Sequence, residues 1–317
     1  MSNTELWHGV YPALLTPFTA DGAIDYPMFK KNFLAQIDAG VSGIIIAGTL
    51  GEASTLTKQE KFDLLVFAKQ HVPSHIPVVL NIAEQATAEA VDIAKEAETL
   101  GADALMLLPP MRYKASDREV VTYFKTVAKA TALPIMIYNN PVDYAIHVTV
   151  EMFAELMECP NIQAVKESTR DLTNITRMIN RFGDRFKVLG GVDTIALESQ
   201  LMGASGSVAG LVDAFPRETV AIYRLVQAGQ LEEALSIYRW FMPLLELDIH
   251  PRLVQYIKFA AAAEGLSNEH VRAPRLPLEG EERERIKKII DDAIATRPEL
   301  PDYLNLPLNP AIEKVSS

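Results

Sequence analysis

The chain repeats one pattern eight times, in which a short and unbroken apolar run is followed by a longer amphipathic stretch. The apolar runs occupy residues 9–17, 42–49, 76–83, 102–110, 133–141, 162–168, 186–193 and 206–212. Continuous rather than alternating apolar residues are typical of parallel strands that are covered on both faces. Eight strand–helix units match a (β/α)8 TIM barrel, which takes about 250 residues. The sequence therefore predicts an α/β barrel over residues 1–227.

Helix-end signals in the amphipathic stretches agree with this prediction. Thr57 is suited to open the helix after the second run, and Gly101 is suited to close the helix before the fourth. A doubly wound open sheet is the rival fold. The count of eight runs and the lack of a G-x-G-x-x-G motif after the first of them disfavour that rival.

The strand signal stops after residue 227. Residues 228–300 contain three amphipathic stretches and are predicted to form a C-terminal three-helix region, an appendage to the barrel. The remaining residues, 301–317, are rich in proline and are predicted to form an extended tail.

Composition excludes several classes of partner. The net charge is -11, with 30 Lys and Arg against 41 Asp and Glu, and no basic stripe of the kind that binds nucleic acid occurs. The single cysteine, Cys159, cannot form an intramolecular disulfide and fits a reducing compartment. Residues 1–10 lack the features of a signal peptide, and every apolar run is shorter than the roughly 20 residues of a membrane span. We expect a cytoplasmic protein with neither nucleic-acid nor membrane partners.

Lys166 lies inside the sixth apolar run, where a charge is costly unless it is paired or neutralised. Desolvation lowers the pKa of a buried lysine, so that neutral amine is available to attack a carbonyl carbon. The resulting protonated imine withdraws electrons from the adjacent carbon, so a bond beside it can break. Tyr138, in the fifth run, can relay the protons that such chemistry requires. The alternative is a lysine that reaches out to water.

The segment GTLGE, residues 48–52, follows the second run and precedes a predicted helix. Its glycines, Gly48 and Gly51, let backbone N–H groups point toward an anion such as a carboxylate, although a plain turn is the alternative. His71 and His75 have a metal-ligand interval, but Pro73 breaks the helix that would align them. No phosphate loop or dinucleotide motif occurs, so we predict neither a cofactor nor a metal.

Five motifs together give a specific resemblance. They are LLTPF at 14–18, GTLGE at 48–52, YNNP at 138–141, AVKES at 164–168 and GASGSVAG at 203–210. With these motifs the chain resembles the dihydrodipicolinate synthase / N-acetylneuraminate lyase family of class I aldolases and lyases, and the interval between Tyr138 and Lys166 is the one usual there.

The resemblance implies a role for each matched residue. Lys166 would form an imine with a 2-oxo acid, commonly pyruvate, and Tyr138 would shuttle protons. The N–H groups of Thr49 and Leu50 would hold the substrate carboxylate, and the Thr49 hydroxyl would join the proton relay. Val208 would place its backbone carbonyl beside the imine. The resemblance also implies a homo-oligomer, a tetramer or a dimer, without cofactor or metal.

Three positions depart from the family pattern. Leu50 stands where a hydroxyl-bearing residue is usual. Met111 stands where synthases carry a relay tyrosine that reaches a neighbouring subunit, with Tyr113 as a possible substitute. Asp143 stands where synthases of the lysine pathway carry an arginine that binds the second substrate's carboxylate. Asp143 and Tyr144 suit a hydroxyl, ammonium or ring-nitrogen partner instead.

The aspartate at position 143 favours some reactions of the family over others. A charge pair at about 4 Å and an effective dielectric constant of about 20 is worth roughly 4 kcal/mol, so reversing one sign disfavours a carboxylate substrate strongly. We therefore expect a Schiff-base lyase that acts through Lys166 on a small 2-oxo acid or its cyclic imine. A hydro-lyase or deaminase is favoured, such as a hydroxylated pyrroline-carboxylate deaminase. The alternatives are a dihydrodipicolinate (4-hydroxy-tetrahydrodipicolinate) synthase, a 2-keto-3-deoxy sugar acid aldolase or dehydratase, and a non-catalytic barrel that binds a 2-oxo acid.

Overall fold

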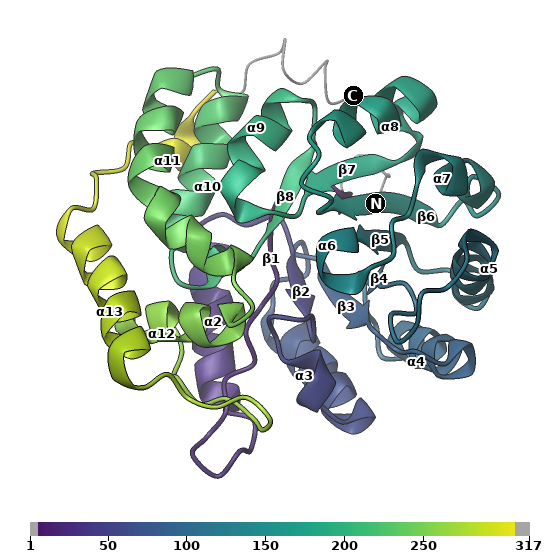
Figure 1. Ribbon diagram of the computed structural model, residues 1–317, viewed down its shortest axis with the longest axis horizontal. Helices are drawn as coiled ribbons and strands as arrows, with labels where there is room; N and C mark the ends of the chain where they lie inside the picture. The colour runs from purple at the N-terminus through teal and green to yellow at the C-terminus, as the bar shows by residue number, and fades with distance from the viewer. Residues whose placement is uncertain (1–5, 308–317) are drawn as a thin grey trace.

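The fold is a TIM barrel with additional C-terminal helices, as seen in the computed structural model, which describes residues 6–307 (Figure 1). Each predicted apolar run contains one strand, and the eight strands are parallel, in the order β1-β8-β7-β6-β5-β4-β3-β2. Their bounds are Gly9–Pro12 (β1), Ile44–Ile46 (β2), Val78–Ile82 (β3), Ala104–Leu107 (β4), Ile135–Asn139 (β5), Ile162–Glu167 (β6), Lys187–Gly190 (β7) and Gly206–Ala209 (β8). The predicted fold class is confirmed.

Helices follow the strands and surround them (Figure 1). The bounds of the helices associated with the barrel are Tyr26–Asp38 (α2), Lys58–His71 (α3), Thr87–Thr99 (α4), Asp117–Ala128 (α5), Pro141–Tyr144 (α6), Val150–Leu156 (α7), Thr173–Phe182 (α8), Ala196–Leu201 (α9) and Pro216–Gln227 (α10). Thr57 caps α3 and exchanges reciprocal hydrogen bonds with Glu60, while Gly101 follows α4 with a φ of +84°. The two predicted helix ends are therefore confirmed.

The first and second strands close the barrel through a short parallel contact. The N–H of Leu14 donates to the carbonyl of Ile45 at 2.9 Å, and the N–H of Ser42 donates to the carbonyl of Val10 at 2.9 Å. Large buried side chains, among them Tyr11, Met106 and Met136, fill the interior. The barrel is therefore a packed core, and space for a ligand remains at the end where the strands point.

Three further helices occur where the sequence predicts them, at Leu231–Leu245 (α11), Leu253–Ala263 (α12) and Gly280–Ala295 (α13). Their apolar side chains form one buried cluster with Leu15 and Leu50, which come from the loops after β1 and β2. Between α11 and α12 a short 3₁₀ helix, Glu246–Ile249 (η5), lies at the rim of the pocket described below. The C-terminal region thus contributes to the mouth of the barrel. A domain boundary at residue 227 stays a prediction.

The predicted extended tail, 301–317, lies only partly within the described range. Residues Tyr303–Asn305 form a 3₁₀ helix (η6), with the Tyr303 side chain buried, and residues 308–317 lie outside the described residues. Within residues 6–307, no helix combines the length and apolar character that a membrane crossing requires.

Candidate active site

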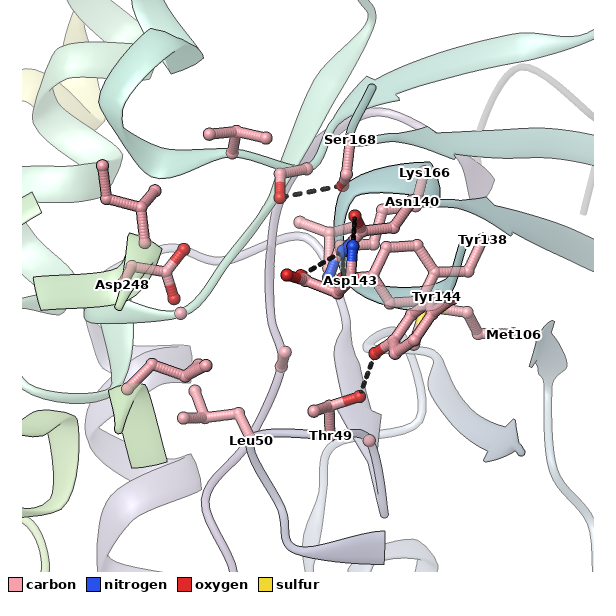
Figure 2. A pocket seen from close by; sticks show the side chains of 18 of the residues that line it. Thr49, Leu50, Met106, Tyr138, Asn140, Asp143, Tyr144, Lys166, Ser168 and Asp248 are labelled. Atoms are coloured by element: carbon pink, nitrogen blue, oxygen red, sulfur yellow. Dashed lines mark hydrogen bonds between the residues drawn. The ribbon is translucent and has the colours of Figure 1, made fainter. Parts of the chain in front are cut away.

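A pocket lies at the carboxyl ends of the strands, where TIM-barrel sites occur (Figure 2). It collects side chains from several strand ends and from the C-terminal region, which are far apart in sequence. Most of the residues singled out from the sequence line it. These are Gly48, Thr49, Leu50, Tyr138, Asp143, Tyr144, Lys166 and Val208.

Lys166 comes from β6 and is 7 % exposed. It lies beside Tyr138 of β5 in the strand register, and its Nζ is 4.1 Å from the centre of the Tyr138 ring. Desolvation lowers the pKa of Lys166, and the nearby Tyr144, Asp248 and Asp193 oppose that shift in part. The sequence-based expectation that this amine is buried next to a phenol agrees with the geometry.

A second buried lysine shows what is unusual about Lys166. Lys258 of α12 is fully buried and donates from its Nζ to a carboxylate oxygen of Glu52 at 2.6 Å. Lys166, in contrast, has no carboxylate within 4.0 Å of its Nζ among residues 6–307. A buried cation without an anion is costly, so burial disfavours the protonated form of Lys166 relative to that of an exposed lysine.

Tyr138 is held in place by the first residue of the next loop. The Nδ2 of Asn140 donates to the Tyr138 hydroxyl at 3.2 Å and to the Asp143 carboxylate at 2.7 Å, and the Asn140 Oδ1 caps α6. Burial raises the pKa of Tyr138 to about 12, so its hydroxyl keeps its proton at neutral pH. The phenol is therefore available as a proton donor beside Lys166.

Thr49 and Tyr144 point toward each other in the pocket, and Tyr144 lies beside Tyr138 (Figure 2). Their hydroxyls share a hydrogen bond of 2.5 Å, and the Tyr144 ring meets the Tyr138 ring edge to face, with centres 5.4 Å apart. Burial raises the pKa of Tyr144, which therefore also stays protonated. Two phenols and one aliphatic hydroxyl thus surround the space next to the amine.

The GTLGE turn offers unpaired backbone donors. The N–H groups of Thr49 and Leu50 donate to no acceptor within the described part of the chain. The turn itself is fixed, because the Thr16 hydroxyl donates to the carbonyl of Gly51 at 2.7 Å. Glu52 has a left-handed φ of 57° and is held by Lys258. Free N–H groups on a rigid turn suit an anionic ligand.

The loop after β7 packs tightly against the lysine. A Cβ placed on Gly191 would lie 2.7 Å from the Cγ of Lys166 and 2.1 Å from the Oγ of Ser168. The Ser168 hydroxyl donates to the carbonyl of Gly191 at 3.0 Å. Only a glycine at position 191 leaves the Lys166 side chain its observed path into the pocket.

The mouth of the pocket carries three charged residues. Asp143 lies on α6, Arg170 follows β6 with a left-handed φ of 63°, and Asp248 lies on η5. Burial raises the pKa of Asp248 well above its usual value. The Asp248 carboxylate packs against Gly210, where a Cβ would lie 2.2 Å from its Oδ1. The sequence reasoning included Asp143 but missed both Arg170 and Asp248.

Tyr113 is the exception among the residues singled out from the sequence. Its side chain is 57 % exposed and lines a separate surface groove with Ser116 and Glu119. Met111 is partly buried against the barrel interior and does not line the pocket. Within its own chain, the structure therefore does not bring Tyr113 to the amine, because the loop after β4 directs it outward.

The chain is similar over most of its length to a known protein family and to named relatives. The model of the Dihydrodipicolinate synthetase family matches residues 6–293. A 4-hydroxy-tetrahydrodipicolinate synthase of Bartonella quintana is 33 % identical over 287 residues, which cover 90 % of this chain and 96 % of the relative. A protein of the same name from Exiguobacterium sibiricum is 34 % identical over 276 residues, covering 86 % of this chain and 92 % of the relative.

Solved structures agree with this similarity. The dihydrodipicolinate synthase of Aquifex aeolicus superposes with a TM-score of 0.86 at 29 % identity, covering 96 % of this chain and all of that chain. YagE, a prophage protein of the dihydrodipicolinic acid synthase family from E. coli K12, was solved in complex with pyruvate. It superposes with a TM-score of 0.86 at 25 % identity, covering 91 % of this chain and 99 % of that chain.

Proposed function

The chain belongs to the dihydrodipicolinate synthetase family and is a lyase of that family, and from this premise we propose that it forms a Schiff base between Lys166 and pyruvate or a related 2-oxo acid. The observation that carries the proposal is the desolvated Lys166 amine, which has no carboxylate partner and lies 4.1 Å from the Tyr138 ring centre. An amine in this setting is a nucleophile at neutral pH.

The chemistry follows from the positions of these groups. The neutral Lys166 amine attacks the carbonyl carbon of the 2-oxo acid, and the carbinolamine loses water to give a protonated imine. Loss of a proton from the adjacent carbon gives an enamine, which attacks the aldehyde carbon of a second substrate. The aldehyde oxygen then takes up a proton and becomes a hydroxyl. Tyr138 would supply and accept these protons, which its protonated hydroxyl beside Lys166 supports.

The GTLGE turn orients the 2-oxo acid for this attack. The free N–H groups of Thr49 and Leu50 would bind its carboxylate, and Val208 would border the imine on the β8 side. Binding through backbone donors explains how Leu50 can replace a hydroxyl-bearing residue, because the N–H group is retained.

The first candidate for the second substrate is aspartate semialdehyde, which would make the enzyme a 4-hydroxy-tetrahydrodipicolinate synthase. The relatives bear this name, and they support the synthase better than the deaminase that the sequence reasoning favoured. Asp143 shares the pocket mouth with two other charged residues, Arg170 and Asp248. Arg170 lines the same mouth and would bind the carboxylate, while Asp143 would accept the ammonium group. Opposite charges at the mouth suit a zwitterionic end of a substrate.

Replacing Arg170 by Gln tests this assignment. We expect the KM for aspartate semialdehyde to rise roughly 10- to 100-fold, because a charge-assisted hydrogen bond is worth about 1.5–3 kcal/mol. The KM for pyruvate should stay unchanged, since Arg170 lies at the mouth. Steady-state kinetics with each substrate varied in turn measure both values, and Arg170→Lys should recover part of the loss. A variant that weakens pyruvate instead would contradict the assignment.

The second candidate is the hydroxylated pyrroline-carboxylate deaminase, and Asp248 is the observation that favours it. Burial keeps this carboxyl group protonated more readily than an exposed one, and it lines the pocket mouth. A protonated carboxyl there could give its proton to a leaving hydroxyl group. Turnover of the hydroxylated pyrroline carboxylate, in parallel with aspartate semialdehyde and 2-keto-3-deoxy sugar acids, separates the deaminase, the synthase and the sugar-acid aldolase.

Reductive trapping tests the Schiff base itself. The protein is incubated with pyruvate and borohydride, and peptides are mapped by mass spectrometry. We expect an adduct of one pyruvate less one oxygen atom on Lys166. Lys258, which is buried and ion-paired, serves as the internal control and should stay unmodified. Binding of pyruvate without any adduct would favour the non-catalytic barrel.

The pH dependence of trapping follows from the lowered pKa of Lys166. Only the neutral amine attacks the carbonyl, so the initial rate of imine formation should rise with pH and level off. Because desolvation lowers the pKa of Lys166 from 10.5, the plateau should begin below that pH. Trapping with excess cyanoborohydride over a pH series measures the profile. A rate that still climbs at the pKa of an ordinary lysine would contradict the desolvated amine.

We also propose a homo-oligomer, a dimer or tetramer, located in the cytoplasm. Light scattering on a size-exclusion column measures the assembly.

A further inference from the structure

The contact between Thr49 and Tyr144 has no counterpart in the roles that the family resemblance implies. That resemblance assigns the outer end of the proton relay to a tyrosine that reaches a neighbouring subunit, at the position of Met111. A thioether cannot exchange protons, and Tyr113 lies outside the pocket of its own chain. Tyr144 instead bonds to the Thr49 hydroxyl within the same chain, at 2.5 Å.

We infer that Tyr144 is a catalytic proton-transfer residue of its own chain, and that it replaces the relay tyrosine expected from a neighbouring subunit. The inference rests on the proposed Schiff-base function. The relay comprises the hydroxyls of Tyr138, Thr49 and Tyr144, and all three line the pocket that contains Lys166 (Figure 2).

Local structure holds Tyr144 in this position. It is the last residue of α6, a single helical turn capped by Asn140, and the next residue, Ala145, has a left-handed φ of 58°. Asn140 also donates to the Tyr138 hydroxyl, so one side chain links Tyr138 of β5 to α6, the helix that carries Tyr144. The edge-to-face contact of the two rings fixes their relative orientation.

The protons balance along this path. When the carbinolamine loses water, the leaving oxygen takes a proton from Tyr138. The reacting oxygen of the substrate would lie between the Tyr138 and Thr49 hydroxyls, and it would pass a proton from Thr49 to restore Tyr138. Tyr144 then restores Thr49 across their hydrogen bond. Tyr144 is half-buried at the pocket mouth and takes its own proton from water.

The test is Tyr144→Phe, which removes the hydroxyl and keeps the ring that packs on Tyr138. We expect kcat to fall roughly 10²-fold or more, as for the loss of other acid–base groups, with little change in the KM for pyruvate. Tyr113→Phe makes the same chemical change outside the pocket and should leave kcat unchanged. Wild-type kcat in Tyr144→Phe, or a loss in Tyr113→Phe, would overturn the inference.

A double-mutant cycle separates relay function from packing. Thr49→Val breaks the same path, so the pair Thr49→Val with Tyr144→Phe should be no slower than Thr49→Val alone. Independent, multiplicative losses would indicate that the two hydroxyls act separately. Trapping of pyruvate on Lys166 should still reach completion in Tyr144→Phe, only more slowly. Absence of an adduct in the wild type would overturn the proposed function rather than the relay.

Mixed oligomers decide whether Tyr144 acts within its own chain. Lys166→Met and Tyr144→Phe chains are co-expressed with different tags and purified together. A tyrosine serving a neighbouring site would restore activity, because one chain supplies Lys166 and the other supplies Tyr144. We expect no restored activity, since each chain lacks one group of its own site. Recovery above the activity of Tyr144→Phe alone would overturn the inference.

Discussion

Replacing Lys166 by Met should abolish turnover and leave the fold intact. We expect kcat/KM to fall roughly 10³-fold or more, as it does when other covalent nucleophiles are removed. Methionine has a similar length, so packing against Tyr138 and Gly191 should persist. The variant also removes a desolvated amine without an ionic partner, so the melting temperature should stay equal or rise.

Three measurements check this expectation: steady-state kinetics, borohydride trapping with pyruvate, and thermal unfolding. Loss of both activity and adduct at an unchanged melting temperature would identify Lys166 as the nucleophile. Retained turnover in Lys166→Met would show that the reaction does not pass through an imine at this residue. Lys258 is not interchangeable with Lys166 in this role, because its amine is paired with Glu52.

Replacing Lys258 by Met should instead destabilise the protein. The change leaves the Glu52 carboxylate buried with its closest cation removed, and breaking a buried pair in this way costs about 3–5 kcal/mol. Arg275 at 3.5 Å and the N–H of Arg272 at 3.2 Å still contact Glu52, so we expect the lower end of that range. Urea unfolding followed by circular dichroism gives the change in the free energy of unfolding.

The paired variant Glu52→Gln with Lys258→Met is the matched control. Removing both charges leaves no fully buried uncompensated ion, since Arg275 is partly exposed, so the double variant should be more stable than Lys258→Met alone. The Lys258→Met variant should also bind pyruvate more weakly, because Glu52 ends the GTLGE turn that carries the carboxylate-binding N–H groups. A loss below about 1 kcal/mol would mean that the two arginines hold Glu52 unaided.

The fold could be predicted from the sequence because its signals are local. Each of the eight strands lies within its own apolar run, and Thr57 marks a helix start through contacts within four residues. Lys166 and Tyr138 could be paired for a related reason, because they lie on consecutive strands that are neighbours in the sheet. Parallel neighbours bring their carboxyl ends to the same rim.

The residues that the sequence reasoning missed depend on long-range packing or on unusual backbone. Asp248 reaches the pocket only because α11 packs on the barrel and η5 returns over its mouth, which no local pattern indicates. Arg170 lies four positions after Lys166, but its backbone has a left-handed conformation that is rare for arginine. The position of its side chain at the pocket mouth therefore could not be read from the sequence pattern. The bond from Tyr144 to Thr49 joins α6 to the turn after β2, and the two residues are 95 positions apart.

The buried pair of Glu52 and Lys258 also limits how early the pocket can form while the protein is being synthesised. The two partners are 206 positions apart, so a ribosome that adds about 5–20 residues per second makes the lysine roughly 10–40 s after the glutamate. Until then that carboxylate lacks its buried ammonium partner and must stay hydrated. The segment from η5 through α12 therefore finishes the pocket, and catalytic competence arrives only after that segment has been made.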